Sequence, residues 1–258
     1  MKNHFNFRRF GQLFKKHSVE NFKQYALSTG VLIGSMTLVM GFIAYLSGSP
    51  IVSQQQAIFF ILFLLGSGFI FTSSIFSNLG NKNQAVAALS LPASHFEKYL
   101  VGWLYSFLIF SVVFTASFYV VITLIVNLDE WHSQEKEILN VFSAEQEVYG
   151  AYIIYAFLHA VAIWGAIFFT KTQFIKTAFV FLVLAGLLTT LNFQVLEAIF
   201  QQDLHVATPF TNVGFQVDKE YYSLELPEQQ QRLIVLVPIV LALLFWATAY
   251  ARIREKQL

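Results

Sequence analysis

Long runs of apolar residues alternate with shorter polar segments along this chain. A helix needs roughly 20 apolar residues to cross the hydrocarbon of a bilayer. Six runs of about that length contain no Asp, Glu, Lys or Arg: residues 25–46, 57–76, 99–126, 150–170, 177–193 and 233–250. Because lipid offers no partner for open backbone groups, each run is predicted to be helical. The fifth run has room to extend to Ile199, and the third is long enough to tilt, kink or protrude.

Composition supports the same class. Apolar residues make up 56% of the 258 residues and charged residues 12%, about half the charged share of soluble domains. We therefore predict an all-α, polytopic membrane protein. Its membrane domain covers residues 25–258, with outer loops at 127–149 and 194–232, and a leader covers residues 1–24. The second outer loop is expected to begin with a helical piece at 197–205 and to continue with strand-like residues. These loops would form either a small external cap or a solvated connection.

Basic residues predict the orientation. Of the 16 Lys and Arg, 13 fall in residues 1–24, 77–98, 171–176 and 251–258, whereas 12 of the 15 acidic residues fall on the other side. Lys and Arg accumulate in cytoplasmic segments. Both termini are therefore predicted to be cytoplasmic.

The leader has the pattern of an amphipathic helix. At 100° per residue, one arc of a helical wheel carries four apolar residues, and the opposite arc carries Arg8, Arg9, Lys15, Lys16 and Lys23. The apolar arc consists of Phe7, Phe10, Leu13 and Phe14. This separation is typical of a helix lying in the membrane surface. The alternative is a basic tail that only sets the topology.

The segment between the second and third runs predicts a rigid elbow. Residues 83–89 favour a short helix, which Pro92 would end. Ser94 and Glu97 then have the spacing of a capping box at the start of the third run. The exposed side of this elbow is a plausible docking surface, and the alternative is an ordinary connector.

Small residues recur in the first run at Gly30, Gly34, Thr37 and Gly41. This spacing includes a GxxxG pattern, which permits close helix packing in membranes. The partner would be either another helix of this chain or a second subunit.

Patterns that carry chemistry are few. The sequence has no Walker A loop, no H-E-x-x-H, no G-x-S-x-G and no cysteine, so P-loop binding of ATP and thiolate chemistry are excluded. The six runs also lack the carboxylates and bases, histidine apart, that ion-coupled transporters use. His159 in the fourth run is expected to be a neutral residue bonded to a neighbouring helix rather than a proton carrier. We expect a non-catalytic chain.

Two local stretches resemble a known family. The first stretch is residues 88–100, Ala-Leu-Ser-Leu-Pro-Ala-Ser-His-Phe-Glu-Lys-Tyr-Leu, followed by Trp103-Leu104. The second stretch is residues 168–177, Phe-Phe-Thr-Lys-Thr-Gln-Phe-Ile-Lys-Thr. Together with the six runs and the basic leader, they resemble permease subunits of bacterial ATP-binding-cassette (ABC) transporters of the type-two exporter class.

The resemblance implies a coupling helix that docks on a separate ATPase subunit. The coupling residues would be Asn83, Gln84, Val86, Ala88, Leu89, Leu91, Pro92, Ser94, Glu97 and Lys98. The leader would be a connecting helix that also contacts the ATPase, and ATP and Mg would bind that partner rather than this chain. A second permease copy or a paralogue would complete the transporter in the bacterial cytoplasmic membrane. No nucleic-acid partner is expected.

Two other functions compete with this one. A non-transporting scaffold or sensor would bind its ligand through the acidic outer loops. A membrane-embedded enzyme acting on lipid would depend on His159 or His95.

Overall fold

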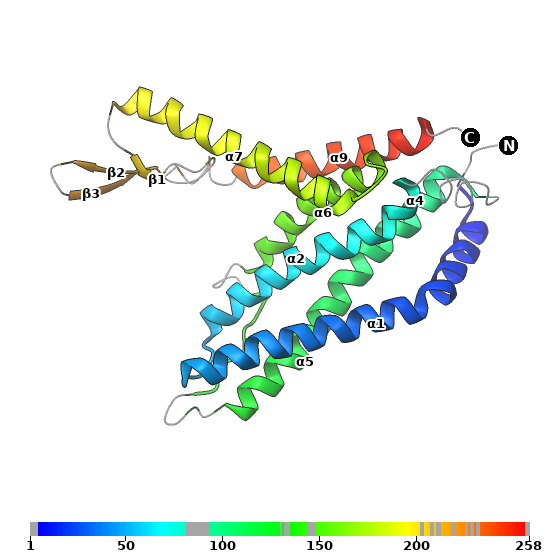
Figure 1. Ribbon diagram of the computed structural model, residues 1–258, viewed down its shortest axis with the longest axis horizontal. Helices are drawn as coiled ribbons and strands as arrows, with labels where there is room; N and C mark the ends of the chain where they lie inside the picture. Colours follow the sequence, from blue (N-terminus) through cyan, green and yellow to red (C-terminus); the bar gives the residue numbers. More distant parts are fainter. Residues whose placement is uncertain are drawn as a thin grey trace.

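The apolar runs form long helices in the computed structural model of the protein (Figure 1). It describes residues 5–80, 93–129, 131, 135–143, 148–201, 204–206, 209, 213–217, 220–224, 227, 230 and 233–255. The helices are α1 (Phe7–Ser47), α2 (Ser53–Gly80), α4 (His95–Trp103), the π-helix η1 (Leu104–Ile109), α5 (Phe110–Leu128), the 3-10 turn η2 (Val148–Gly150), α6 (Ala151–Phe168), α7 (Gln173–Phe200) and α9 (Leu236–Glu255). The strands are β1 (Leu204–Val206), β2 (Val213–Val217) and β3 (Glu220–Leu224).

Six helical segments are long and apolar enough to cross a membrane, which confirms the predicted number. α4, η1 and α5 form one continuous segment of 34 residues, so the long third run is accommodated by a π-helical turn. α7 continues to Phe200, as its sequence allowed. The six segments are the frame of a multi-pass membrane protein.

α1 contains both the leader and the first apolar run. It is 41 residues long, or about 60 Å at 1.5 Å per residue, twice the thickness of the hydrocarbon. Asn6 caps its start by accepting from the backbone N–H groups of Arg8 and Arg9, and Gly48, in the left-handed region at φ 58°, ends it. The leader is thus helical; its position on a membrane surface stays a prediction.

α6 is the centre of the bundle and packs against α2 on one side and α9 on the other. Over half of its apolar window (56%) is buried, against 6% for α7. One core joins α1, α2 and α5 around Met36, Phe60 and Phe118. A second core joins α2, α4, α6 and α9 around Phe76 and Ile163. α1, α2 and α5 run side by side, and α7 and α9 diverge from them (Figure 1).

The two loops that are predicted to lie on the outer side differ from each other. The first is attached to the bundle: buried Gln56 donates to the carbonyls of Ile51 and Glu137 and accepts from the N–H of Leu139. The second carries an antiparallel sheet in the order β1-β2-β3, which extends beyond the end of α7 (Figure 1). The all-α prediction therefore needs this correction, because tyrosine- and valine-rich segments here pair as strands. The helical piece at 197–205 was also wrong in part, since α7 ends at Phe200 and His205 lies in β1.

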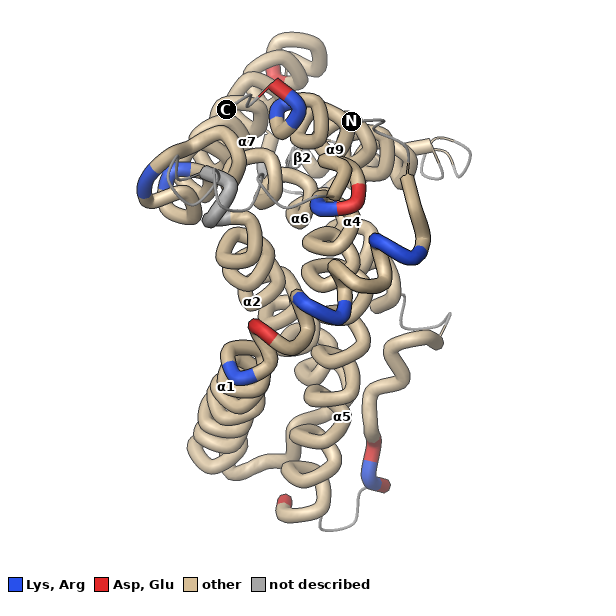
Figure 2. The backbone as a smooth tube through the Cα atoms, turned by 90° about the vertical axis from the view of Figure 1, so that its right-hand side faces the viewer, with Lys and Arg blue, Asp and Glu red and all other residues tan. Residues whose placement is uncertain are grey.

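Both chain ends lie at the same end of the bundle (Figure 2). Lys and Arg of the described residues gather around this end and along the first turns of α1, whereas the charged residues of the loop after α5 lie at the opposite end. The fold thus brings together the basic segments that lie far apart in the sequence.

Candidate functional site

The first turn of α1 and the start of α4 meet at the end of the bundle that holds the termini. The ring of Phe5 lies 5.9 Å from that of Phe96, and Phe96 lies 5.7 Å from Tyr250 of α9. Three segments from the beginning, middle and end of the sequence therefore converge. We call the contact between the starts of α1 and α4 the α1–α4 junction; its polar residues are Asn6, Arg9, Ser94 and Glu97.

A capping box starts α4, as predicted. The hydroxyl of Ser94 accepts from the backbone N–H of Glu97 at 3.2 Å, and the Glu97 carboxylate accepts from the backbone N–H of Ser94 at 2.9 Å. Each interaction satisfies a donor that the first helical turn leaves open. Both side chains are buried, so the cap also fixes the direction in which the third span begins.

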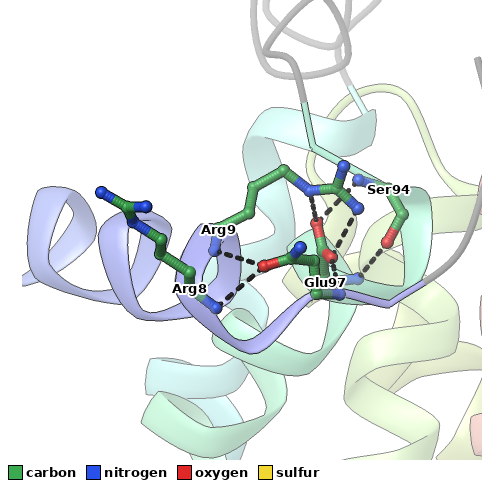
Figure 3. A network of polar contacts seen from close by, with 5 residues as sticks. Arg8, Arg9, Ser94 and Glu97 are labelled. Atoms are coloured by element: carbon green, nitrogen blue, oxygen red, sulfur yellow. Dashed lines mark hydrogen bonds and ion pairs between the residues drawn. The ribbon is translucent and has the colours of Figure 1, made fainter.

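Glu97 also holds the start of α1 (Figure 3). Its Oε2 accepts from Nε of Arg9 at 2.6 Å, and its Oε1 accepts from Nη2 of Arg9 at 2.7 Å and from the backbone N–H of Asn6 at 2.8 Å. With the Ser94 bond, the carboxylate accepts four hydrogen bonds. A two-point arginine–carboxylate pair is among the stronger polar contacts in proteins. One buried side chain thus connects two helix starts separated by 88 residues.

Electrostatics keep this carboxylate ionised. Glu97 precedes the apolar stretch 99–126 and lies outside it. The hydrogen bond from Arg9 lowers the pKa of Glu97 to about 2, with help from the backbone donors of Asn6 and Ser94 and against the opposing effect of burial. The junction is therefore charged and paired at every physiological pH.

The leader packs on the π-helix through its apolar arc. The ring of Phe14 lies 4.9 Å from that of Tyr105, and the hydroxyl of Ser18 is hydrogen-bonded to the Tyr105 hydroxyl. Phe10 contacts the rings of Phe5 and Phe14. Phe7 is 82% exposed, so it lies off this contact, whereas Phe10, Leu13 and Phe14 are half-buried.

The predicted coupling residues divide into two groups. Ser94 and Glu97 are buried in the α1–α4 junction, and Lys98 is half-buried beside them. The other coupling residues lie outside the described part of the chain: Asn83, Gln84, Val86, Ala88, Leu89, Leu91 and Pro92. Ala93, the next residue, is described and leads directly into the Ser94 cap.

A second polar group lies inside the bundle, between the third, fourth and sixth spans. The indole N–H of Trp246 donates to Nδ1 of His159 at 3.1 Å, and Nε2 of His159 lies 2.8 Å from the Ser106 hydroxyl. Because an indole only donates, Nδ1 must accept and Nε2 carries the proton. Ser106 lies in η1, and its hydroxyl also bonds the carbonyl of Gly102. The expected bonding of His159 to neighbouring helices is confirmed.

The small-residue stripe of α1 faces open space. A Cβ atom built on Gly30, Gly34 or Gly41 would meet nothing within 4 Å. Among the described residues, therefore, no helix of this chain packs on these glycines, although this was one of the two predicted arrangements. Packing against a second subunit stays a prediction.

Sequence reasoning missed Arg9 and Asn6 as junction residues. Asn6 directly before Phe7-Arg8-Arg9 is a recognisable helix cap, and it was available as a signal. Among the described residues, no group of three or more His, Asp or Glu could hold a metal ion. No protein-family model matches the chain, and no curated protein or solved structure matches it either.

Proposed function

We propose that this chain is the membrane-spanning permease subunit of an ATP-driven ABC transporter, an exporter, powered by a separate ATPase subunit. The six apolar helices would form the membrane domain of this permease. The assignment to the ABC exporter class is supported by the resemblance of residues 88–104 and 168–177 to that family. In this proposal the termini face the bacterial cytoplasm, because the basic residues gather at that end.

The α1–α4 junction is the observation that carries the proposal. A coupling helix within residues 83–89, followed by Pro92, would lie a few residues before the Ser94 cap. Movement of that helix would reach the third span through α4, which Ser94 and Glu97 fix at its first turn. The same movement would reach α1, because Arg9 and the Asn6 N–H are bound to Glu97.

Glu97 and Ser94 therefore have a different role from the other coupling residues. Both are buried, so they would transmit force without touching the ATPase. The exposed contact would fall to the segment before them. A second permease copy, packed on the open glycine stripe of α1, would complete the pathway.

The test is a pull-down with the tagged full-length chain from its native membranes, in which an ATPase subunit should co-purify. Replacing Ala88-Leu89-Ser90-Leu91 by Gly-Ser-Gly-Ser should abolish co-purification of the ATPase and its stimulated ATP hydrolysis, while the chain still inserts in the membrane. Alanine replacement of exposed Tyr222-Ser223-Leu224 in the outer sheet is the matched control and should change neither. The proposal fails if the altered elbow retains the ATPase, or if the purified chain hydrolyses ATP alone.

A further inference from the structure

A basic groove lies on the solvent-facing surface of the α1–α4 junction. Its volume is about 430 Å³, within the range of sites that bind small molecules. Arg8, Gln12 and Lys16 line it from one face of α1, since residues four apart lie one above the other on a helix. The other lining residues are Asn6, Arg9, Leu13 and Ala93, and among the residues that the structure describes no carboxylate lines the groove.

Two of the three cations in the groove are directed to solvent. Arg9 is bound to Glu97, whereas the guanidinium of Arg8 points away from Glu97 (Figure 3). Lys16 is an exposed residue whose ammonium lies 3.7 Å from exposed Glu20, a pair of little strength. Arg8 and Lys16 therefore present positive charge to a ligand at the groove.

Contacts of α1 give the level of the groove relative to the bilayer. Arg9 binds Glu97, which lies two residues before the apolar stretch 99–126. Phe14 contacts Tyr105, which lies about 9 Å into that stretch at 1.5 Å per residue. The groove runs from Arg8, beside the first of these contacts, to Lys16, just past the second, so it spans the level at which the apolar stretch begins, where lipid phosphates would lie.

We propose that this groove binds the phosphate of an anionic lipid head group from the leaflet on the side of the termini. Arg8 and Lys16 would bind the phosphate oxygens, and the amide of Gln12 would donate a third hydrogen bond. Leu13 would contact the glycerol end of the lipid. Basic pockets beside membrane helices recognise anionic head groups in this way.

The bound lipid would stabilise the start of α1 at the membrane surface. It would therefore hold α1 against α4 independently of any ATPase, and the inference does not depend on the transporter assignment.

The experiment measures lipid binding to the purified full-length chain in detergent by native mass spectrometry. The probes are phosphatidylglycerol, phosphatidylcholine with the same acyl chains, and inorganic phosphate as competitor. We expect a preference for phosphatidylglycerol. A Lys or Arg near the membrane surface contributes about five-fold in affinity, so R8Q/K16Q should lose between about five- and twenty-five-fold.

Lys15→Gln is the matched control, because Lys15 is exposed on the same helix but does not line the groove. The proposal is supported if R8Q and K16Q weaken phosphatidylglycerol binding and K15Q does not. It is overturned if K15Q weakens binding equally, if inorganic phosphate displaces the lipid at comparable concentration, or if R8Q/K16Q binds normally. Normal lipid binding with loss of ATPase co-purification would assign the groove to an acidic surface of the ATPase instead.

Discussion

Arg9 and Glu97 form a two-point ion pair with distances of 2.6 and 2.7 Å across 88 residues of sequence. The carboxylate is fully buried and the arginine side chain is 31% exposed. The pair lies where the leader meets the third span. Its strength therefore bears on whether these two helices move as one unit.

Glu97→Gln should lower the thermal stability of the purified protein. The amide oxygen still accepts one backbone bond, but the charged pair with Arg9 is lost, at a cost of about 2 kcal/mol for hydrogen bonds to a charged group. Scanning fluorimetry in detergent measures the shift in midpoint. Lys15→Gln changes an exposed residue of the same helix that makes no part of the junction or the groove, and it should have almost no effect.

A double-mutant cycle tests whether loss of the Arg9–Glu97 ion pair causes the loss of stability. R9Q/E97Q should be less destabilised than the sum of R9Q and E97Q, because each single change leaves one unpaired partner. Strict additivity would show that the two side chains do not interact in the protein.

Low pH should weaken the same junction. The pKa of Glu97 falls from 4.5 in the unfolded chain to about 2 in the folded protein, so the folded state favours the ionised form. This contribution is complete above about pH 4.5 and is lost as the pH falls toward 2. Between pH 6 and pH 3 the thermal midpoint of the native protein should therefore fall by more than that of E97Q. Parallel curves for the two proteins would contradict the assignment.

Gly165→Ala should disturb the contact between α6 and α7. A Cβ atom at Gly165 would overlap the hydroxyl oxygen of Thr177 and lie 2.6 Å from the Thr177 Cβ, so the two helices must separate. Overpacking of this kind costs about 1–3 kcal/mol. Gly66→Ala, with nothing within 4 Å, is the control and should be neutral or slightly stabilising. Equal midpoints for the two variants in the same fluorimetric assay would be incompatible with this packing.

His159→Leu should destabilise the interior of the bundle. The change leaves the indole N–H of Trp246 and the hydroxyl of Ser106 without their shared partner, and an unsatisfied buried donor costs about 1–3 kcal/mol. Measurements are the thermal midpoint and the emission of Trp246 in a variant that lacks the other three tryptophans. Trp246→Phe is the companion change, and H159L/W246F should lose less than the sum. An unchanged midpoint in H159L would show that this network contributes nothing.

The sequence predicted those features of the fold that depend on residues close together along the chain, namely the helix cap and the spans. Ser94 and Glu97 are three residues apart, and the cap they form follows from that spacing alone. The apolar runs likewise predicted the spans, because each helix satisfies its own backbone in lipid.

Contacts between distant segments were beyond the sequence. Nothing near Arg9 indicates that its carboxylate partner lies 88 residues away, and the pairing of Val213 with Leu224 in the outer sheet depends on turn geometry that apolar patterning does not encode. The glycine stripe shows the same limit: its spacing predicts close packing but not which helix packs there. The sequence predicted that His159 is hydrogen-bonded to a neighbouring helix. Its partners Ser106 and Trp246 could be identified only from the fold.

The wide turn at Leu104–Ile109 has a consequence for how the third span could change its length. A π-turn accommodates an extra residue, so the helical halves before and after it keep their faces toward their neighbours. Deleting exposed Leu108 would let the backbone rewind as an ordinary α-helix without turning either half. The same deletion in α5 would rotate everything beyond it by about 100° and would expose Phe118 and Ile122 to lipid in place of their present partners.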